Sequence, residues 1–206
     1  MKRKKLNPRF KLQRRLMIEL PGLGKPGALE RRPYPPGQHG QNRIKYSEHR
    51  LQLEEKQKIR IHYGLREEQL IRIVKKAKRQ AHNWSESLIN LLEKRLDNIV
   101  FRGGFAPSIA SACQLISHGK ILVNGKKVSI RSFTVKQSDI VSLKSSALNN
   151  QAYLQAKQSP RLPIPDWLSK TENNNEAWLK LIDEPSIKSV PFALDEGLVI
   201  SYYSKV

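Results

Sequence analysis

The chain has 206 residues, and 38 Lys and Arg against 18 Asp and Glu give it a formal net charge of +20 at pH 7. Such self-repulsion does not stabilise a free protein, so the composition predicts a polyanionic partner, nucleic acid above all, rather than an ordinary surface of mixed signs. No stretch has the length of a membrane span or the apolar core of a signal peptide, so we expect the protein to be made where it works. Cys113 is the sole cysteine, which rules out a disulfide within the chain and a Cys-rich zinc site; we expect it to pack as a small apolar side chain.

Residues 1–45 are predicted to form a basic extended arm. They hold 13 Lys and Arg, two Glu and the Pro- and Gly-rich run PGLGKPGALERRPYPPGQHG. Such a segment buries too little apolar area to offset the entropy of ordering its backbone, so alone it is expected to be disordered and to order on RNA; a flexible solvated tail is the alternative. The Arg14-Arg15 and Arg31-Arg32 pairs are the foremost phosphate contacts, because a guanidinium can bind two oxygens. The candidate RNA contacts of the arm are Arg3, Arg9, Lys11, Arg14, Arg15, Arg31, Arg32, Gln38, His39, Arg43 and Lys45.

A helical domain is predicted over residues 46–91. Its first helix, SEHRLQLEEKQKIRIHYG, begins at a capping Ser47 and ends at Gly64, with Leu51, Ile59 and Tyr63 on one side. The candidate RNA contacts on its polar side are Arg50, Gln57, Lys58 and Arg60.

The next helix, residues 67–81, is predicted to be strongly amphipathic. Its apolar face comprises Leu70, Ile73, Val74, Ala77 and Ala81, and the opposite face carries Arg72, Lys75, Lys76 and Arg79 at i, i+3, i+4 and i+7. We expect the basic face to contact phosphates. A membrane-surface helix is less favoured, because the apolar face lacks Trp and Phe; a merely solvated face is the other alternative.

A compact module of two helices and a hairpin is predicted over residues 92–147. Apolar residues recur at helical spacing at Leu88, Leu92, Leu96 and Ile99, which predicts one helix. Ser85 or Ser87 is expected to cap its start, and Gly103-Gly104 to end it. A second helix begins after Pro107-Ser108 and stops at Gly119. Strands 121–123 and 128–130 flank Asn124-Gly125, which favours a two-residue type I′ turn. The candidate RNA contacts here are Arg95, His118, Lys120, Asn124, Lys126 and Lys127.

Residues 148–206 are predicted to be a C-terminal extension. Before it, residues 135–143 indicate two short strands around a polar turn at 137–139. Residues 149–165 and 171–175 are polar and interrupted by Pro, which is typical of connections rather than core. Trp167 and Trp178 are interpreted as core anchors rather than base-stacking platforms. Residues 197–204 alternate as a terminal strand that returns to the body, so the predicted fold class is α+β.

Several motifs resemble the small-subunit ribosomal protein four family of bacteria and organelles. RLDN at 95–98 and QLISHGKILVNGKKV at 114–128 are similar to its RNA-binding module. RRL followed by LPGL, then PPGQHG, QLEEKQKIRIHYGL and the segment 197–204, resemble its arm, helical domain and C-terminus. ELPGL, EEKQKIRIHYGL and YYS are most similar to cyanobacterial and plastid members.

This resemblance implies a structural protein, not an enzyme, without cofactor or metal. By that resemblance it binds the five-prime domain of small-subunit ribosomal RNA early, nucleates assembly there, and with ribosomal protein five influences accuracy near the mRNA entry. It implies a place in the small subunit, with the plastid stroma favoured and the bacterial cytoplasm next. Ile109 and Cys113 replace Arg residues of many bacterial relatives, which shifts the expected RNA contacts toward the hairpin.

Two other classes of RNA-handling protein share this module. Pseudouridine synthases carry the same module and an Arg-Leu-Asp triplet with a catalytic Asp, which residues 95–97 mimic. Their triplet lies in a separate downstream domain, for which this chain has no room, so Asp97 is expected to be a helix-surface or capping carboxylate that positions Arg95 or Arg102. The five His residues lack metal-ligand spacing and a paired nucleophile. A small module-bearing factor that binds stalled ribosomes or tRNA is the other alternative.

Overall fold

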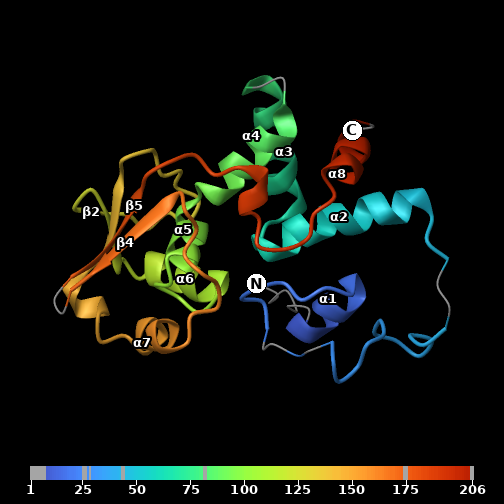
Figure 1. Ribbon diagram of the computed structural model, residues 1–206, viewed down its shortest axis with the longest axis horizontal. Helices are drawn as coiled ribbons and strands as arrows, with labels where there is room; N and C mark the ends of the chain where they lie inside the picture. Colours follow the sequence, from blue (N-terminus) through green and yellow to red (C-terminus); the bar gives the residue numbers. More distant parts are fainter. Residues whose placement is uncertain are drawn as a thin grey trace, which may run out of the picture. The chain divides into compact units, whose positions relative to one another are not determined.

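The computed structural model of the chain describes residues 8–24, 27, 29–42, 45–80, 83–173 and 176–204. Two compact units are present: residues 1–65 with 192–206 form unit 1, and residues 66–191 form unit 2 (Figure 1). Helices and an antiparallel sheet together make the fold α+β, as predicted. The division of the chain by function stays a prediction, with segments at 1–45, 46–91, 92–147 and 148–206. None of the helices in the described ranges is long and apolar enough to cross a bilayer.

Unit 1 is built around α2, Glu48–His62, with α1, Arg9–Leu16, and α8, Glu196–Ser204, packed on it. As predicted, the Ser47 hydroxyl caps α2 by accepting the N–H of Arg50. Leu16 and Leu20 are buried in the unit, so the arm contributes apolar contacts that the sequence prediction did not assign to it. Of the three apolar residues predicted to share one side of α2, Ile59 and Tyr63 are buried, whereas Leu51 is 39% exposed.

The C-terminal segment is a helix, which corrects the predicted terminal strand. The Asp195 carboxylate accepts the N–H of Leu198 at 3.2 Å and so caps the first turn of α8. Val199 and Tyr203, one helical turn apart, are both 2% exposed. An apolar segment as short as this fits the periodicity of a strand and that of a helix. Contact with α2 stabilises the helix.

Four helices begin unit 2: α3, Glu67–Gln80; α4, Trp84–Glu93; α5, Leu96–Arg102; and α6, Ile109–Ser117. The single helix predicted through residues 88–99 is interrupted after α4. There Val135 N–H donates to the Lys94 carbonyl, and Leu96 N–H donates to the Phe133 carbonyl. A distant segment therefore takes the hydrogen bonds that a continuous helix would use. Asn83 precedes α4, rather than either predicted serine, whereas α6 has its predicted Ser108 cap.

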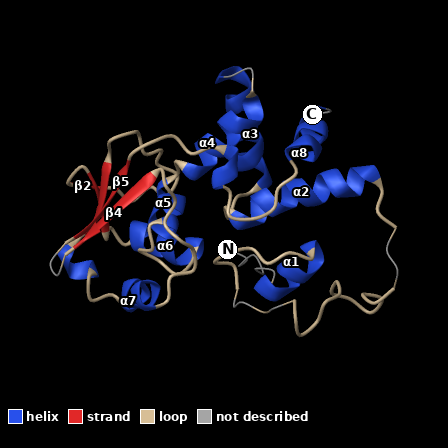
Figure 2. Cartoon of the chain, viewed as in Figure 1, coloured by secondary structure: helices blue, strands red, loops and turns tan. Residues whose placement is uncertain are grey.

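A five-stranded antiparallel sheet follows, in the order β2-β1-β3-β5-β4. The strands are red in Figure 2. The strands are β1, Ile121–Val123; β2, Lys126–Lys127; β3, Ile140–Leu143; β4, Leu168–Glu172; and β5, Ala177–Leu181. Asn124 and Gly125 both have positive φ, 49° and 77°, which makes the predicted type I′ turn. The second hairpin strand ends at Lys127, earlier than predicted, and Val135 forms no strand.

The core of unit 2 lies between α5, α6 and one face of the sheet, as Figure 2 shows. Alternate strand residues such as Val141 and Leu179 are buried on this face. The interpretation of residues 149–165 as connection is wrong in part, because α7, Gln151–Gln158, buries Tyr153 in the same core. Trp167 is a core anchor as predicted, whereas Trp178 is only half-buried. Short 3-10 turns at Ser145–Ala147 and Ile187–Ser189 complete the unit.

Candidate nucleic-acid interface

The clearest group of exposed cations lies on α3. Leu70, Val74 and Ala77 are buried on one side of the helix, as predicted. Arg72, Lys75, Lys76 and Arg79 are all exposed, and none has an acidic partner among the residues that the structure describes. We call these four residues the α3 stripe. A rigid helix thus presents four unneutralised cations in one row, which suits a run of phosphates.

A second group of cations surrounds the hairpin turn of unit 2. Lys126 and Lys127 are exposed on β2, and His118 is exposed at the end of α6. Lys120 reaches Ser146 Oγ at 3.3 Å and remains partly exposed. These side chains form a basic edge on unit 2, and their contact with RNA stays a prediction.

Asn124, also predicted to contact RNA, has a structural task in the same hairpin. Its amide nitrogen donates to Asp139 Oδ1 at 2.8 Å, and its carbonyl accepts the N–H of Ile140 at 2.9 Å. Both ends of the side chain therefore hold the hairpin to β3. Contact with RNA through this side chain would compete with those bonds.

The sequence interpretation missed two exposed cations beside the hairpin, Lys136 and Lys144. The Lys144 N–H donates to the Lys120 carbonyl, and the turn that contains Lys136 includes Asp139, the partner of Asn124. Both positions extend the basic edge. Their charge next to predicted strands could have indicated them. The sequence did not show, however, that β1 pairs with β3.

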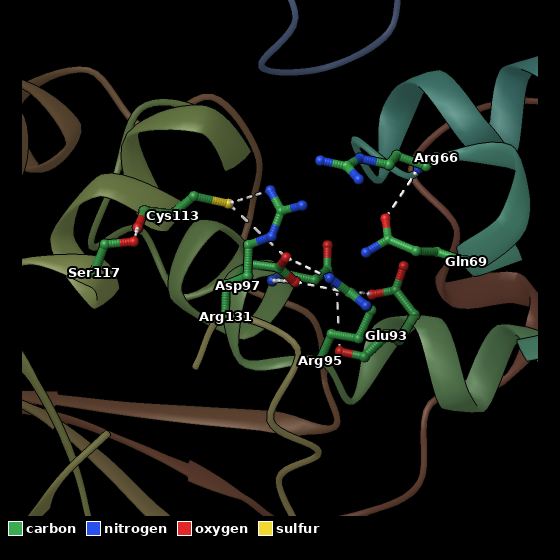
Figure 3. A network of polar contacts seen from close by, with 9 residues as sticks. Arg66, Gln69, Glu93, Arg95, Asp97, Cys113, Ser117 and Arg131 are labelled. Carbon is green, nitrogen blue, oxygen red and sulfur yellow. Dashed lines mark hydrogen bonds and ion pairs between the residues drawn. The ribbon is translucent and has the colours of Figure 1, made fainter. Parts of the chain in front are cut away.

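Arg95 differs from the other predicted contacts, because it is buried in a polar network (Figure 3). It is 6% exposed and makes two bonds to Asp97, from Nε to Oδ1 at 3.0 Å and from Nη2 to Oδ2 at 2.7 Å. The expectation that Asp97 positions Arg95 is confirmed, although this carboxylate is buried rather than on the helix surface. The guanidinium is therefore not presented to a phosphate in this conformation.

The same network joins α4 to α5 and to the chain beyond the sheet. Asn98 Nδ2 donates to Glu93 Oε2 at 2.8 Å, and Arg102 Nε lies 3.7 Å from the same oxygen. Arg102 Nη2 also donates to the carbonyl of Ser189 at 2.8 Å. The RLDN motif therefore supports the fold around the helix break.

Cys113 lies at the edge of this network. Its Sγ is 3.9 Å from Asp97 Oδ2 and 3.8 Å from Arg131 Nη1 (Figure 3). Burial, and then the Asp97 carboxylate, raise the pKa of the Cys113 thiol. A thiol held neutral and packed against the core is consistent with the expected apolar role.

The arm and α2 supply the remaining predicted contacts. In α2, Arg50 is paired with Glu54, Lys58 with Glu55, and Arg60 Nε donates to Gln57 Oε1, so these side chains are partly engaged. Arg14 is half-buried and bonded within the arm. Arg3 and Arg43 lie outside the described residues. The exposed predicted contacts of the arm are Arg9, Lys11, Arg15, Arg31, Arg32, Gln38, His39 and Lys45.

A metal centre has no support in the described ranges, where no group of three His, Cys, Asp or Glu side chains is placed to hold an ion. Asp97, the residue that mimics a catalytic aspartate, is 2% exposed and neutralised by Arg95. The Asp97 carboxylate is therefore enclosed by the fold and paired with a cation.

Comparison with known proteins gives two family matches and close relatives. Residues 4–93 match the model described as Ribosomal protein S4/S9 N-terminal domain, and residues 94–141 match the S4 domain. Small ribosomal subunit protein uS4B of Bdellovibrio bacteriovorus is 62% identical over 99% of both chains. Small ribosomal subunit protein uS4 of Methylobacillus flagellatus is 43% identical over 96% of both, and that of Nocardia farcinica is 42% identical over 96% of this chain and 97% of the relative. The two matched regions meet between residues 93 and 94, at the end of α4.

Proposed function

Since the chain belongs to the uS4 family of small ribosomal subunit proteins, we propose that it is a structural constituent of that subunit and binds its ribosomal RNA. The observation that carries this proposal is the α3 stripe, four exposed cations on a rigid helix without acidic partners among the described residues. A-form RNA hides base edges in a deep groove, so folded RNA is recognised largely by shape and phosphate position. Fixed rows of cations suit that mode.

The distribution of charge supports RNA binding by the first three quarters of the chain. Residues 148–206 carry six Lys and Arg against seven Asp and Glu, whereas residues 1–147 carry 32 against 11. Each phosphate that a cation neutralises releases counterions, so the basic part supplies the salt-dependent share of the affinity. The C-terminal part is proposed to serve the fold.

The finer assignment rests on the family resemblance. We propose that the protein binds the five-prime domain of small-subunit ribosomal RNA and nucleates assembly there. We also propose that it contacts ribosomal protein five near the mRNA entry and so influences decoding accuracy. The relatives described above come from bacteria, which favours the bacterial cytoplasm over the plastid stroma as the compartment.

A non-ribosomal factor with the same module is the second candidate, because the S4 domain accounts for residues 94–141 alone. The match to the N-terminal domain and the coverage of 96–99% of ribosomal relatives weigh against it. A pseudouridine synthase is disfavoured by the burial of Asp97 in its ion pair with Arg95.

Binding to a five-prime domain transcript of bacterial small-subunit ribosomal RNA tests the proposal. The control is an unrelated structured RNA of equal length, with salt and competitor titrated for both. We expect specific binding to survive physiological salt while binding to the control is lost. Equal loss of both RNAs with salt would contradict the ribosomal assignment and favour a general RNA-binding factor.

A further inference from the structure

We infer that Arg14 is a positioning residue that holds the loop 34–40 of the arm in shape for RNA, while the adjacent Arg15 contacts phosphate. The inference rests on the proposed RNA-binding function, since it concerns how the arm presents its candidate contacts Gln38 and His39. It assigns different roles to two neighbouring arginines that were both predicted to contact phosphate.

Arg14 uses two of its five N–H donors for hydrogen bonds within the arm. Its Nε donates to the carbonyl of Tyr34 at 3.0 Å, and its Nη2 donates to the carbonyl of Pro35 at 3.4 Å. The guanidinium carbon also lies 4.9 Å from the centre of the Tyr34 ring, in cation–π geometry. A planar fork that bonds two successive carbonyls and stacks on a ring fixes where the loop begins relative to α1.

The loop closes on the carbonyl that Arg14 binds. A Cβ on Gly40 would lie only 2.0 Å from the Pro35 oxygen, a backbone atom that cannot swing away as a flexible side chain can. The Gly40 N–H in turn donates to the Gly37 carbonyl at 3.4 Å. Gly40 and Arg14 thus approach the same oxygen, and together they define the closed form of the loop.

Gln38 and His39 stand at the exposed tip of this closed loop. Holding the tip in one shape before binding lowers the entropy lost when RNA orders it. Arg15, in contrast, is exposed and makes no hydrogen bond or ion pair with any described residue. Its guanidinium is available to a phosphate.

The first measurement needs no RNA. Hydrogen–deuterium exchange of residues 33–42 is recorded for the full chain, Arg14→Lys and Arg15→Lys, and the Arg14 Nε–H resonance is recorded for the native chain and Arg15→Lys. Lysine keeps the charge but has neither the fork nor the planar face, so Arg14→Lys should open the loop and Arg15→Lys should not.

The second measurement is binding of the same variants to the five-prime domain transcript across a salt series. Arg14→Lys should lower affinity about tenfold with an unchanged salt slope, because ordering is lost and charge is kept. Arg15→Lys should bind nearly as the native chain does, and Arg15→Ala should reduce the salt slope by about one unit. Gly40→Ala, which changes no charge, should reproduce the effect of Arg14→Lys on both the loop and the affinity.

The outcomes are distinguishable. Native loop protection and affinity in Arg14→Lys would overturn the inference, and so would an opened loop with unchanged affinity. If the native chain does not prefer the five-prime domain transcript over the control RNA, the proposed function fails. Loop opening in Arg14→Lys but not in Arg15→Lys would then still support the positioning role of Arg14 within the arm.

Discussion

At the level of single residues, the surroundings of each arginine, rather than its charge, determine whether it can contact RNA. Arg15 is exposed, Arg14 is bonded to two carbonyls, and Arg95 is buried against Asp97. A buried ion pair is not strong evidence of net stabilisation, because desolvation offsets the attraction. Removing one partner is costly, however, because the other charge stays buried without compensation.

Asp97→Ala should therefore destabilise unit 2 severely. The change leaves the Arg95 guanidinium buried without its carboxylate, and we expect the free energy of unfolding to fall by about 3 kcal/mol. Denaturant titration followed by circular dichroism measures it. Glu184→Ala is the matched control: it removes the partner of Lys94, but the Glu184 side chain is 60% exposed, so a loss below about 1 kcal/mol is expected. Equal effects of the two substitutions would contradict the assigned role of the buried pair.

Glu172 gives unit 2 a defined acid sensitivity. Burial alone raises the pKa of this carboxyl, but hydrogen bonds from Lys157 and Tyr153 and the nearby Lys170 ammonium outweigh it and lower the pKa to about 2. The folded pKa lies below the ordinary 4.5, so the stabilisation is present above pH 4.5 and is lost as pH falls toward 2.

The expected loss is on the order of 1 kcal/mol, because the site is partly open to solvent. Glu172→Gln should flatten the fall in unfolding free energy between pH 5 and about pH 2. Glu176→Gln, at the exposed position directly before β5, is the control. An acid dependence identical in both variants would show that other carboxylates are responsible.

Among whole elements, α3 shows how one helix serves both fold and interface. Its apolar side packs against α4, and its basic side carries the α3 stripe. The first turn carries Glu67 and Glu68, which suits the positive end of the helix dipole and leaves the cations to the later turns.

Replacing Arg72, Lys75 and Arg79 with Glu should weaken RNA binding without unfolding the helix. The reversed side chains remain exposed, so helical content should be kept, while the salt slope of binding should fall by up to about three units. The control reverses Arg161, Lys180 and Lys188, which are exposed in the charge-balanced C-terminal part and change the net charge equally. Equal loss of affinity in both triple variants would mean that only net charge matters.

For the molecule as a whole, unit 1 joins the two ends of the chain. Residues 192–206 return to α2, where Val199 and Tyr203 are buried and Asp195 N–H donates to Glu55 Oε2 at 3.2 Å. Unit 2 is continuous in sequence, from residue 66 to residue 191. The stability of unit 1 therefore depends on a segment far from the rest of it in sequence.

Truncation after Pro191 should unfold unit 1 and spare unit 2. The change removes the buried side chains of α8, and each large apolar side chain contributes about 1.5–3 kcal/mol when fully buried. Hydrogen–deuterium exchange should speed up in α2 and stay slow in α5, α6 and the sheet. The double variant Leu198→Ala/Ser201→Ala, at positions of α8 that are only half-buried, is the control. Slow exchange retained in α2 after truncation would contradict this dependence.

Local structure and the negative charge of the expected partner could be predicted from the sequence. The Ser47 and Ser108 caps, the Asn124-Gly125 turn and the two faces of α3 depend on neighbours along the chain, so they were predictable and were found. Charge alone indicated nucleic acid.

The sequence could not show which helices and arginines bond to partners far away along the chain, because folding brings those partners close. Hydrogen bonds from residues 133–135 split α4 from α5, and contact with α2 makes residues 196–204 a helix. Asp97 buries Arg95, and two carbonyls some twenty residues away occupy Arg14. The physical reason is the same in each case: a backbone or charged group takes the partner that folding brings close, and that partner has no fixed spacing in the sequence.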